Sequence, residues 1–250
     1  PMSSLLRSLR VPIISLVASA LALAASANTA IKPEPRDANW LKRHEGFVEI
    51  AKKGSVNVLF LGDSITDAWR NPNPERGGKT VWDREFAPLG AENFGIGGDR
   101  TQHVLWRLQN GEFQGIKPKA LVLMIGTNNT GFERDGTTPR NTPAEVAAGV
   151  TEIVKYIRAQ SPTTKILLLG IFPRGEKPDH PQRKQIAEIN AVISKLHDGK
   201  AVHYLDIGPK FLAADGTLPK ETMYDFLHMG QKGYEIWAGA IKQPLAQLLK

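Results

Sequence analysis

Apolar runs alternate with segments of helical periodicity along most of the chain. Five short apolar runs are typical of buried strands, at residues 56–61, 91–94, 120–125, 166–169 and 202–205. Helical spacing of apolar residues follows over residues 100–109, 143–160, 183–197 and 233–249. Because the strands are continuously apolar, both faces of their sheet must be covered. The pattern predicts a three-layer α/β/α fold with a mostly parallel central sheet.

Local signals set some of the predicted boundaries. Thr142 is a candidate N-cap, and Pro143 then stands in the first turn of the helix that follows. Pro244 is out of place within the last helix. Residues 71–80 and 130–142 are rich in Pro, Gly, Arg and Asn, so we expect loops there, bordering any site at the strand ends.

Residues 1–27 have the order of a secretory signal peptide. Arg7 and Arg10 precede an apolar run over residues 11–25 that ends in small residues. This run is shorter than the roughly 20 residues that a bilayer-spanning helix needs. We expect cleavage after Ala27 and a secreted or periplasmic protein without a stable membrane anchor. A retained lipid-facing anchor is the alternative.

The rest of the chain is expected to hold one domain. Residues 28–40 contain Pro33 and Pro35 and are interpreted as a linker from the leader. Residues 41–250 offer no further linker and are assigned to the domain. Pro1, which precedes Met2, is interpreted as an addition to the natural chain.

Composition narrows the chemistry that this domain can perform. The 250 residues include no cysteine, which excludes disulfides, thiol nucleophiles and cysteine-bound metals. The net charge of +7 falls to +5 without the leader, which carries two arginines and no acidic residue. Lys and Arg are scattered rather than clustered, so nucleic-acid binding is not expected.

Polar or glycine-rich clusters follow three of the predicted strands. They are Gly62-Asp63-Ser64, residues 95–99 and residues 126–129, and a fourth cluster lies at residues 225–228 before the last helix. Ligands of open α/β sheets bind beyond the carboxyl ends of the strands. The four clusters are therefore the candidates for a functional site.

Ser64 is the candidate nucleophile. It follows a strand and begins a predicted helix, whose first N–H groups favour a developing negative charge. A plain capping serine is the alternative interpretation. A second flanking glycine is missing, so this is not the G-x-S-x-G elbow of α/β-hydrolases.

His228 and Asp225 are candidates for the base and its orienting carboxylate. Their spacing of three residues lets one turn supply both groups. A surface Asp beside a structural His is the alternative. The other histidines have ordinary explanations, although His103, on the helix after the glycine cluster, could support the site.

Gly98 and Asn128 are candidate oxyanion donors, together with the backbone N–H of Ser64. A glycine allows close approach of its N–H, and the Asn amide supplies another donor. A turn glycine and a turn-capping amide are the alternatives. Arg100 stands where a dinucleotide loop requires its third glycine, and neither a phosphate-binding loop nor metal spacing is present. We expect no cofactor and no metal.

The four clusters resemble the blocks of the SGNH (GDSL-type) hydrolases, in which Ser, Gly, Asn and His stand in separate motifs. The chain is most similar to the catalytic subunits of platelet-activating-factor acetylhydrolase Ib. That similarity rests on residues 93–99, 101–108, 126–129, 173–178 and 224–228. It extends from about Val56 to the C-terminus and implies a flavodoxin-like SGNH hydrolase fold.

The resemblance implies a role for each matching residue. Ser64, His228 and Asp225 would be nucleophile, base and orienter, and Gly98, Asn128 and the Ser64 N–H would form the oxyanion hole. Asp63 and Asp99 would hold the loops. A small acyl pocket would be formed by Ile65, Thr127 and Leu227, which favours acetyl groups. The resemblance also suggests a homodimer.

Two departures bear on the substrate. The resembled subunits are intracellular, and residues 71–80 and 130–142 look longer here. The chain is thus expected to be a serine esterase of acetyl or other short acyl esters, plausibly on carbohydrates. Alternatives are a phospholipid acetyl hydrolase, a non-catalytic carbohydrate- or lipid-binding module, and acyl transfer to an acceptor other than water.

Overall fold

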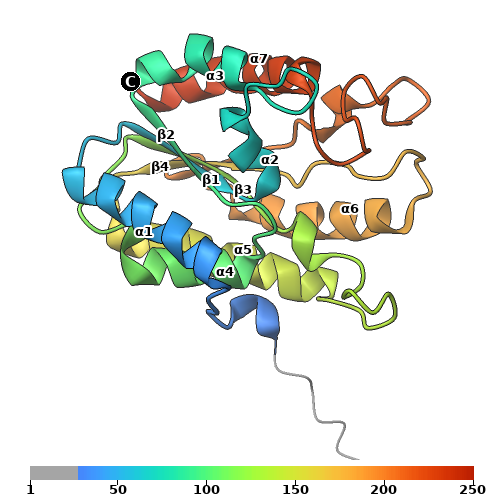
Figure 1. Ribbon diagram of the computed structural model, residues 1–250, viewed down its shortest axis with the longest axis horizontal. Helices are drawn as coiled ribbons and strands as arrows, with labels where there is room; N and C mark the ends of the chain where they lie inside the picture. Colours follow the sequence, from blue (N-terminus) through green and yellow to red (C-terminus); the bar gives the residue numbers. More distant parts are fainter. Residues whose placement is uncertain (1–27) are drawn as a thin grey trace, which may run out of the picture.

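A computed structural model describes residues 28–250, and the predicted signal peptide lies outside the described residues (Figure 1). Five parallel strands form its one sheet in the order β2-β1-β3-β4-β5. They are β1 (Val58–Gly62), β2 (Ala91–Gly95), β3 (Ala120–Met124), β4 (Lys165–Leu169) and β5 (Val202–Leu205). All five lie within two residues of the apolar runs that predicted them.

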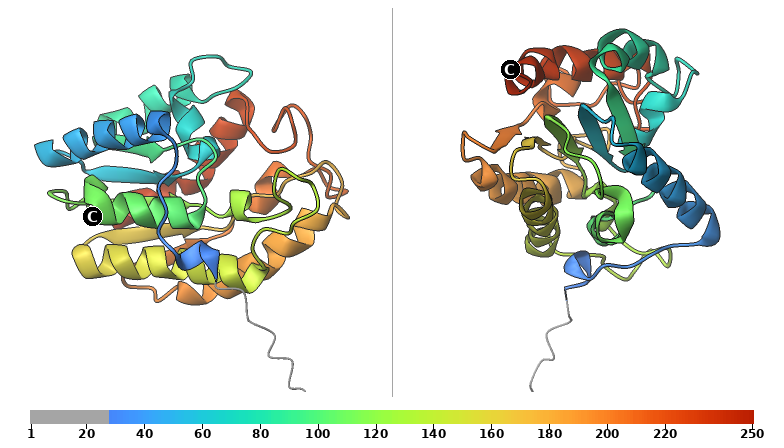
Figure 2. Two further views of the ribbon diagram at one scale, coloured as in Figure 1. Left: turned by 60° about the horizontal axis from the view of Figure 1, so that its bottom comes forward. Right: turned by 90° about the vertical axis from the view of Figure 1, so that its left-hand side faces the viewer.

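Helices cover both faces of the sheet (Figures 1 and 2). One face carries α1 (Ala38–Lys53), α4 (Thr101–Arg107), α5 (Pro143–Gln160) and α6 (Pro181–Ile193). The other carries α3 (Lys79–Glu85) and α7 (Gln231–Leu248). Successive strand residues point to opposite faces, so Leu59 and Leu61 enter the first core and Phe60 the second. The predicted three-layer α/β/α fold is confirmed.

Short helical turns complete the fold. They are η1 (Thr29–Ile31), α2 (Ser64–Asp67), η2 (Ala68–Arg70), η3 (Ala87–Leu89), the π-helical η4 (Leu108–Glu112), η5 (Thr127–Asn129), η6 (Ser194–Leu196) and η7 (Gly208–Phe211). Two of them contain predicted site residues, since α2 begins with Ser64 and η5 holds Asn128. Among the residues that the structure describes, no helix has the length and apolar character needed to cross a membrane.

Two helices were absent from the sequence prediction. In α1, Trp40, His44, Phe47 and Ala51 form a buried stripe on an otherwise polar helix, whose N-terminus is capped by the Asp37 side chain. Helix α3 begins inside the segment predicted as a loop, and only residues 71–78 are irregular there. Both segments contain few buried residues, and α3 has only Val81, so no apolar periodicity marked them.

Residues 28–40 are not a free linker in the structure. Turn η1 packs against α4 and α5, where the Thr101 hydroxyl donates to the Ala30 carbonyl at 2.8 Å. The segment then crosses α4 and enters α1, as Figure 2 shows. Its Arg36 side chain reaches the loop after β2. The two prolines shape a packed connection, so this stretch belongs to the folded domain.

Candidate active site

Ser64 lies at the carboxyl end of β1, as the first residue of α2. The preceding Asp63 caps this helix, since its Oδ1 accepts from the Ile65 N–H at 3.0 Å. A Cβ at Gly62 would lie 2.4 Å from the Met124 carbonyl oxygen, so only glycine fits there. The close approach of β1 to β3, together with the helix cap, positions the serine at the carboxyl-terminal edge of the sheet.

Three side chains form a continuous hydrogen-bond relay. Ser64 Oγ lies 2.9 Å from His228 Nε2. On the other side of the ring, His228 Nδ1 lies 2.8 Å from Asp225 Oδ2. The His228 and Asp225 side chains are 27% and 43% exposed, so the relay opens to solvent. The predicted triad is thus brought together, and its catalytic role stays a prediction.

One tight turn before α7 holds both relay partners. Asp225 Oδ1 accepts from the backbone N–H groups of His228 at 2.7 Å and Leu227 at 3.1 Å. Phe226 between them has a φ of +60°, an uncommon conformation for a non-glycine residue. Burial opposes ionisation of Asp225, but the hydrogen bonds from His228 lower its pKa below the ordinary value. The carboxylate is therefore charged when it meets the imidazole.

Gly98 and Asn128 come together from the loops after β2 and β3. Gly98 has a φ of +80°, and Asn128 Nδ2 donates to the Asp99 carbonyl at 2.9 Å. An amide nitrogen carries two N–H groups, so this bond fixes Asn128 and leaves its second donor. A Cβ at Gly97 would lie 3.8 Å from the Ser64 Cβ, which places this loop beside the serine. The loop that carries Gly98 therefore lies beside Ser64, and Asn128 is bound to that same loop.

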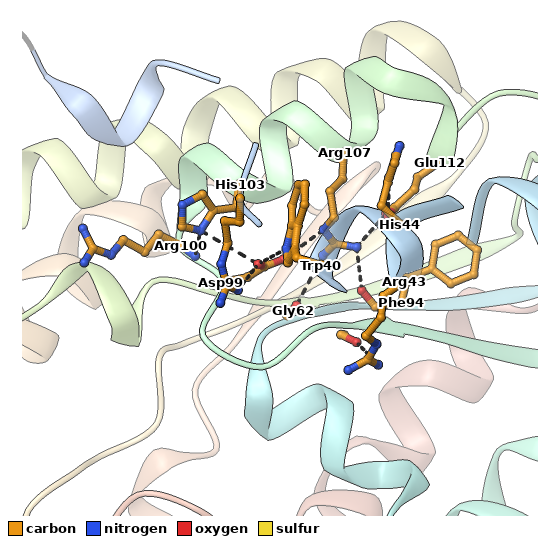
Figure 3. A network of polar contacts seen from close by, with 12 residues as sticks. Trp40, Arg43, His44, Gly62, Phe94, Asp99, Arg100, His103, Arg107 and Glu112 are labelled. Carbon is orange, nitrogen blue, oxygen red and sulfur yellow. Dashed lines mark hydrogen bonds and ion pairs between the residues drawn. The ribbon is translucent and has the colours of Figure 1, made fainter. Parts of the chain in front are cut away.

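Asp99 is the centre of a buried polar network behind Gly98 (Figure 3). Its Oδ1 accepts from Trp40 Nε1 at 2.6 Å and from Arg36 Nη1 at 2.9 Å, and Arg107 Nε lies 2.9 Å from Oδ2. Arg36 also donates to the Gly97 carbonyl at 2.8 Å. The expectation that Asp99 holds its loop agrees with this geometry.

The network continues away from the site into the π-helical turn. Arg107 is fully buried, and its Nη1 lies 2.6 Å from Glu112 Oε2. The other Glu112 oxygen is 2.9 Å from His44 Nδ1, which links the turn to α1. Gly111, with a φ of +110°, lets the chain turn so that Glu112 faces Arg107. Sequence reasoning missed these partners because His44 and Glu112 lie far from any motif.

His103 supports the loop as a neutral side chain. Its Nδ1 accepts from the Arg100 N–H at 2.9 Å, which caps the start of α4. Burial, together with nearby arginines, lowers the pKa of His103 to about 3. A neutral acceptor is what this backbone donor requires. The supporting role that the sequence suggested for His103 fits this contact.

Asp63 is fully buried beneath the nucleophile. Its Oδ2 atom has no hydrogen-bond partner in the described part of the chain. Burial raises the pKa of Asp63 to about 7, although Arg174 nearby acts in the opposite direction. Its observed bond is the helix cap at Ile65. The sequence prediction that Asp63 holds its loop agrees with that contact.

The three predicted acyl-pocket residues lie at different depths. Ile65 is 1% exposed and belongs to the core between the sheet and α7, against which the partly buried Leu227 packs. Thr127 is also buried, and its carbonyl and hydroxyl oxygens accept from Arg174 Nη1 at 3.2 and 3.3 Å. Their joint action on an acyl group stays a prediction. Arg174 stands in one of the motifs that carry the family resemblance, but no role was predicted for it.

One cavity is lined by Ser64, a second by Gly98 and Asn128, and each is bordered by one predicted loop. The first, of about 550 Å³, is lined by Ser64 and His228 and by residues 70–72 and Arg76. The second, of about 670 Å³, is lined by Gly98, Asn128 and the hairpin of residues 131–141. Each loop thus borders one of these cavities, and their place at the substrate entrance stays a prediction.

The comparisons with known proteins agree with this geometry. Residues 60–236 match the model of the GDSL-like Lipase/Acylhydrolase family. The human platelet-activating factor acetylhydrolase IB subunit alpha1 is 36% identical over 228 residues, which are 89% of this chain and 91% of that protein. The alpha2 subunit from Rattus norvegicus is 40% identical over 215 residues, 86% of each chain.

A solved structure supports the fold independently. An acetyl xylan esterase superposes with a TM-score of 0.61 at 20% identity, over 75% of this chain and 98% of that one. The chain belongs to the GDSL-like lipase/acylhydrolase family and is a carboxylic ester hydrolase. Ile65 stands where the family name has its leucine. The predicted resemblance to the acetylhydrolase Ib subunits is confirmed.

Proposed function

We propose that this protein is a secreted or periplasmic serine esterase that removes acetyl or other short acyl groups, with carbohydrate esters as substrates. The observation that carries the proposal is the relay from Ser64 through His228 to Asp225, with distances of 2.9 and 2.8 Å. Neutral imidazole takes the serine proton in such a relay, and the carboxylate stabilises the cation that forms.

In the acylation step, Ser64 Oγ attacks the carbonyl carbon of the ester while His228 Nε2 takes its proton. The oxyanion accepts from the N–H groups of Ser64 and Gly98 and from the Asn128 amide. Each such donor contributes about 10²–10³ in rate. His228 then returns the proton to the departing alcohol, which leaves an acetyl group on Ser64.

Deacylation repeats these steps with water as the nucleophile. His228 takes a proton from water, the hydroxide attacks the acyl carbon, and acetate leaves as the proton returns to Ser64. Every group that the route requires is a side chain or backbone amide of this chain. An added alcohol in place of water would give acyl transfer, which product analysis distinguishes.

A short acyl pocket and an open entrance support small acyl groups on large alcohols. Ile65, Thr127 and Leu227, the residues proposed for the acyl pocket, are large enough to restrict the acyl chain, and the first two are buried. The two cavities of about 550 and 670 Å³ offer room for a bulky alcohol. The similarity to an acetyl xylan esterase fold is compatible with this substrate class.

A phospholipid acetyl ester is the second candidate substrate. The observation in its favour is the identity of 36–40% to the platelet-activating factor acetylhydrolase subunits. Acetate release from acetylated xylan, acetylated monosaccharides and an acetyl phospholipid separates the two. Preference for the carbohydrate esters is expected, and turnover of the phospholipid alone would contradict the proposal.

Two further measurements test the remaining parts of the proposal. Labelling by a serine-reactive fluorophosphonate is expected, and its absence would favour a non-catalytic binding module. Export rests on residues 1–27 alone. N-terminal sequencing of the protein from its natural host is expected to begin at Asn28 in a secreted or periplasmic fraction, and an intact leader in the cytoplasm would contradict export.

A further inference from the structure

The cavity beside His228 lies on the side of the departing alcohol. During acylation His228 Nε2 must give its proton to the alcohol oxygen, so that oxygen leaves close to the ring. Ser64 and His228 line this cavity together with Arg70, Arg76 and Tyr224. Gly98 and Asn128, which would hold the oxyanion, line the other cavity. Arg76 and the other residues that line the first cavity therefore lie where the alcohol part of the ester would bind.

Most charged groups in this cavity are already paired. The Asp67 carboxylate accepts from Arg43 at 2.6 and 2.8 Å and also from Arg70. Arg70 donates in addition to the carbonyls of Asn93 and Gly95. These contacts bind the carboxylate and the Arg70 guanidinium to one another and to the backbone, so the charge of each is already paired.

Arg76 is different from its neighbours. Its guanidinium lies 5.6 Å from the centre of the Tyr224 ring, and Tyr224 in turn stacks on His228 with ring centres 6.2 Å apart. Within the part of the chain that the structure describes, no carboxylate lies at ion-pair distance from Arg76. The adjacent Glu75 lines another cavity, together with Lys220. Arg76 thus presents donors next to the base.

The loop that carries Arg76 is fixed by its own hydrogen bonds. Asn71 Oδ1 accepts from the Asn73 N–H at 3.0 Å, and Asn71 Nδ2 donates to the Arg76 carbonyl at 3.2 Å. The Pro74 carbonyl accepts from the Gln231 N–H of α7 at 2.7 Å. A fixed loop backbone lowers the ordering cost when Arg76 binds an anion. The Arg76 side chain itself is exposed and lies over the Tyr224 ring.

From these observations we infer that Arg76, on its Tyr224 support, is a specificity-determining residue that binds an anionic group on the alcohol side of the ester. The inference rests on the proposed function and narrows its substrate class to carbohydrate esters whose alcohol part carries an anionic group. A carboxylate or a phosphate would each present the paired oxygens that a guanidinium binds. The loop of residues 71–78 would then be the part of the fold that selects them.

Matched esters test the inference. Acetoxyacetate is compared with its neutral amide, which lacks the carboxylate charge. 1-Acetylglycerol 3-phosphate is compared with 1-acetylglycerol, which lacks the whole phosphate group. The ratio of kcat/KM between the charged and neutral ester is measured for the wild type, for Arg76→Gln and for Arg76→Lys. Comparison of this ratio between variants cancels the intrinsic reactivity of each ester.

The expected result is a ratio about tenfold lower in Arg76→Gln, the effect of one charge-assisted hydrogen bond. Arg76→Lys keeps the charge and is expected to retain part of the preference. Arg84→Gln removes the same charge from the exposed surface of α3 and is expected to leave the ratio unchanged. The pair of esters with the larger effect identifies carboxylate or phosphate as the preferred anion.

Two outcomes would overturn the inference alone, and a third would overturn the proposed function with it. In the first, acetyl esters are hydrolysed but Arg76→Gln changes the charged-to-neutral ratio of neither ester pair by more than twofold. The proposed function would then stand without the inference. In the second, Arg84→Gln lowers the ratios as much as Arg76→Gln, which shows a general field effect. If the wild type hydrolyses none of the four esters and also fails on p-nitrophenyl acetate, the proposed function fails together with the inference.

Discussion

Arg140 donates a hydrogen bond of 2.9 Å to the backbone carbonyl of Asn128. Its partner Glu133, on the same hairpin, is also bound by Arg100 at 2.7 Å through both carboxylate oxygens. Arg100 follows the loop of Gly98, so the hairpin of residues 131–141 contacts both candidate oxyanion loops. The segment that was predicted as a loop beside the site therefore supports the proposed oxyanion hole.

Arg140→Met is expected to lower kcat about tenfold with less than a twofold change in KM. The amide of Asn128 would lose its backbone anchor, and a misplaced donor stabilises the transition state less than a fixed one. Steady-state kinetics on p-nitrophenyl acetate gives both constants. Arg140→Lys should recover part of kcat. A rise in KM at constant kcat would instead show that Arg140 acts on substrate binding.

Asp225→Asn is expected to lower kcat/KM by about 10²- to 10⁴-fold, because the amide no longer stabilises the imidazolium or fixes its tautomer. Asp215→Asn provides the matched control, since Asp215 is an exposed turn aspartate that accepts from Thr217. That variant should keep wild-type kinetics. An Asp225→Asn enzyme within threefold of the wild type would remove Asp225 from the relay.

The buried Asp63 predicts a distinctive dependence of stability on pH. Its folded pKa of about 7 is above the ordinary value of 3.8, so the folded state retains a proton that the unfolded state loses. The free energy of unfolding should therefore fall as pH rises from about 4 to 7, by a contribution on the order of a few kcal/mol. Asp63→Asn should flatten this decline in thermal unfolding curves.

Asp198 provides the contrasting control for that measurement. Backbone N–H groups, that of Val202 first, lower the pKa of its exposed carboxyl to about 2. The stability that Asp198 contributes is present above pH 3.8 and is lost as pH falls toward 2. Asp198→Asn should thus change the curve only in that acid range. An unchanged slope between pH 4 and 7 in Asp63→Asn would contradict the assignment of a raised pKa.

The acyl pocket predicts a chain-length profile. The kcat/KM on p-nitrophenyl esters should fall steadily from acetyl to octanoyl. Leu227→Ala should raise the octanoyl-to-acetyl ratio of kcat/KM at least about tenfold, because one methylene in a hydrophobic pocket changes kcat/KM by about that factor. Leu212→Ala, which packs against the same core, is the control. A flat profile in the wild type would show that Leu227 does not limit the acyl chain.

Much of the fold could be predicted because its strongest signals are local. Helix α5 was predicted with both ends correct, since Thr142 and Glu145 form a capping box ahead of the apolar stripe. Helix α7 runs through Pro244, which stands near its C-terminal end and is only partly buried. By contrast, α1 has one buried stripe on a polar helix, which a search for apolar runs overlooks.

The site could be predicted where one motif carries the chemistry, but not where contacts between distant segments carry it. Ser64, Asp225 and His228 stand in motifs that point to their roles. Arg36 stands in a segment that was expected to be a linker, yet it contacts Gly97 and Asp99. Such tertiary contacts leave no periodicity and no motif in the sequence, so only the structure reveals them.

The central claim is that Ser64 carries an acyl group during turnover. Rapid quenching of the wild type with p-nitrophenyl acetate, followed by peptide mass spectrometry, tests it most directly. The account predicts an acetyl group on Ser64, none in Ser64→Ala, and a loss of turnover in Ser64→Ala of at least about 10³-fold. An acetyl group found only on another residue, or wild-type turnover by Ser64→Ala, would contradict it.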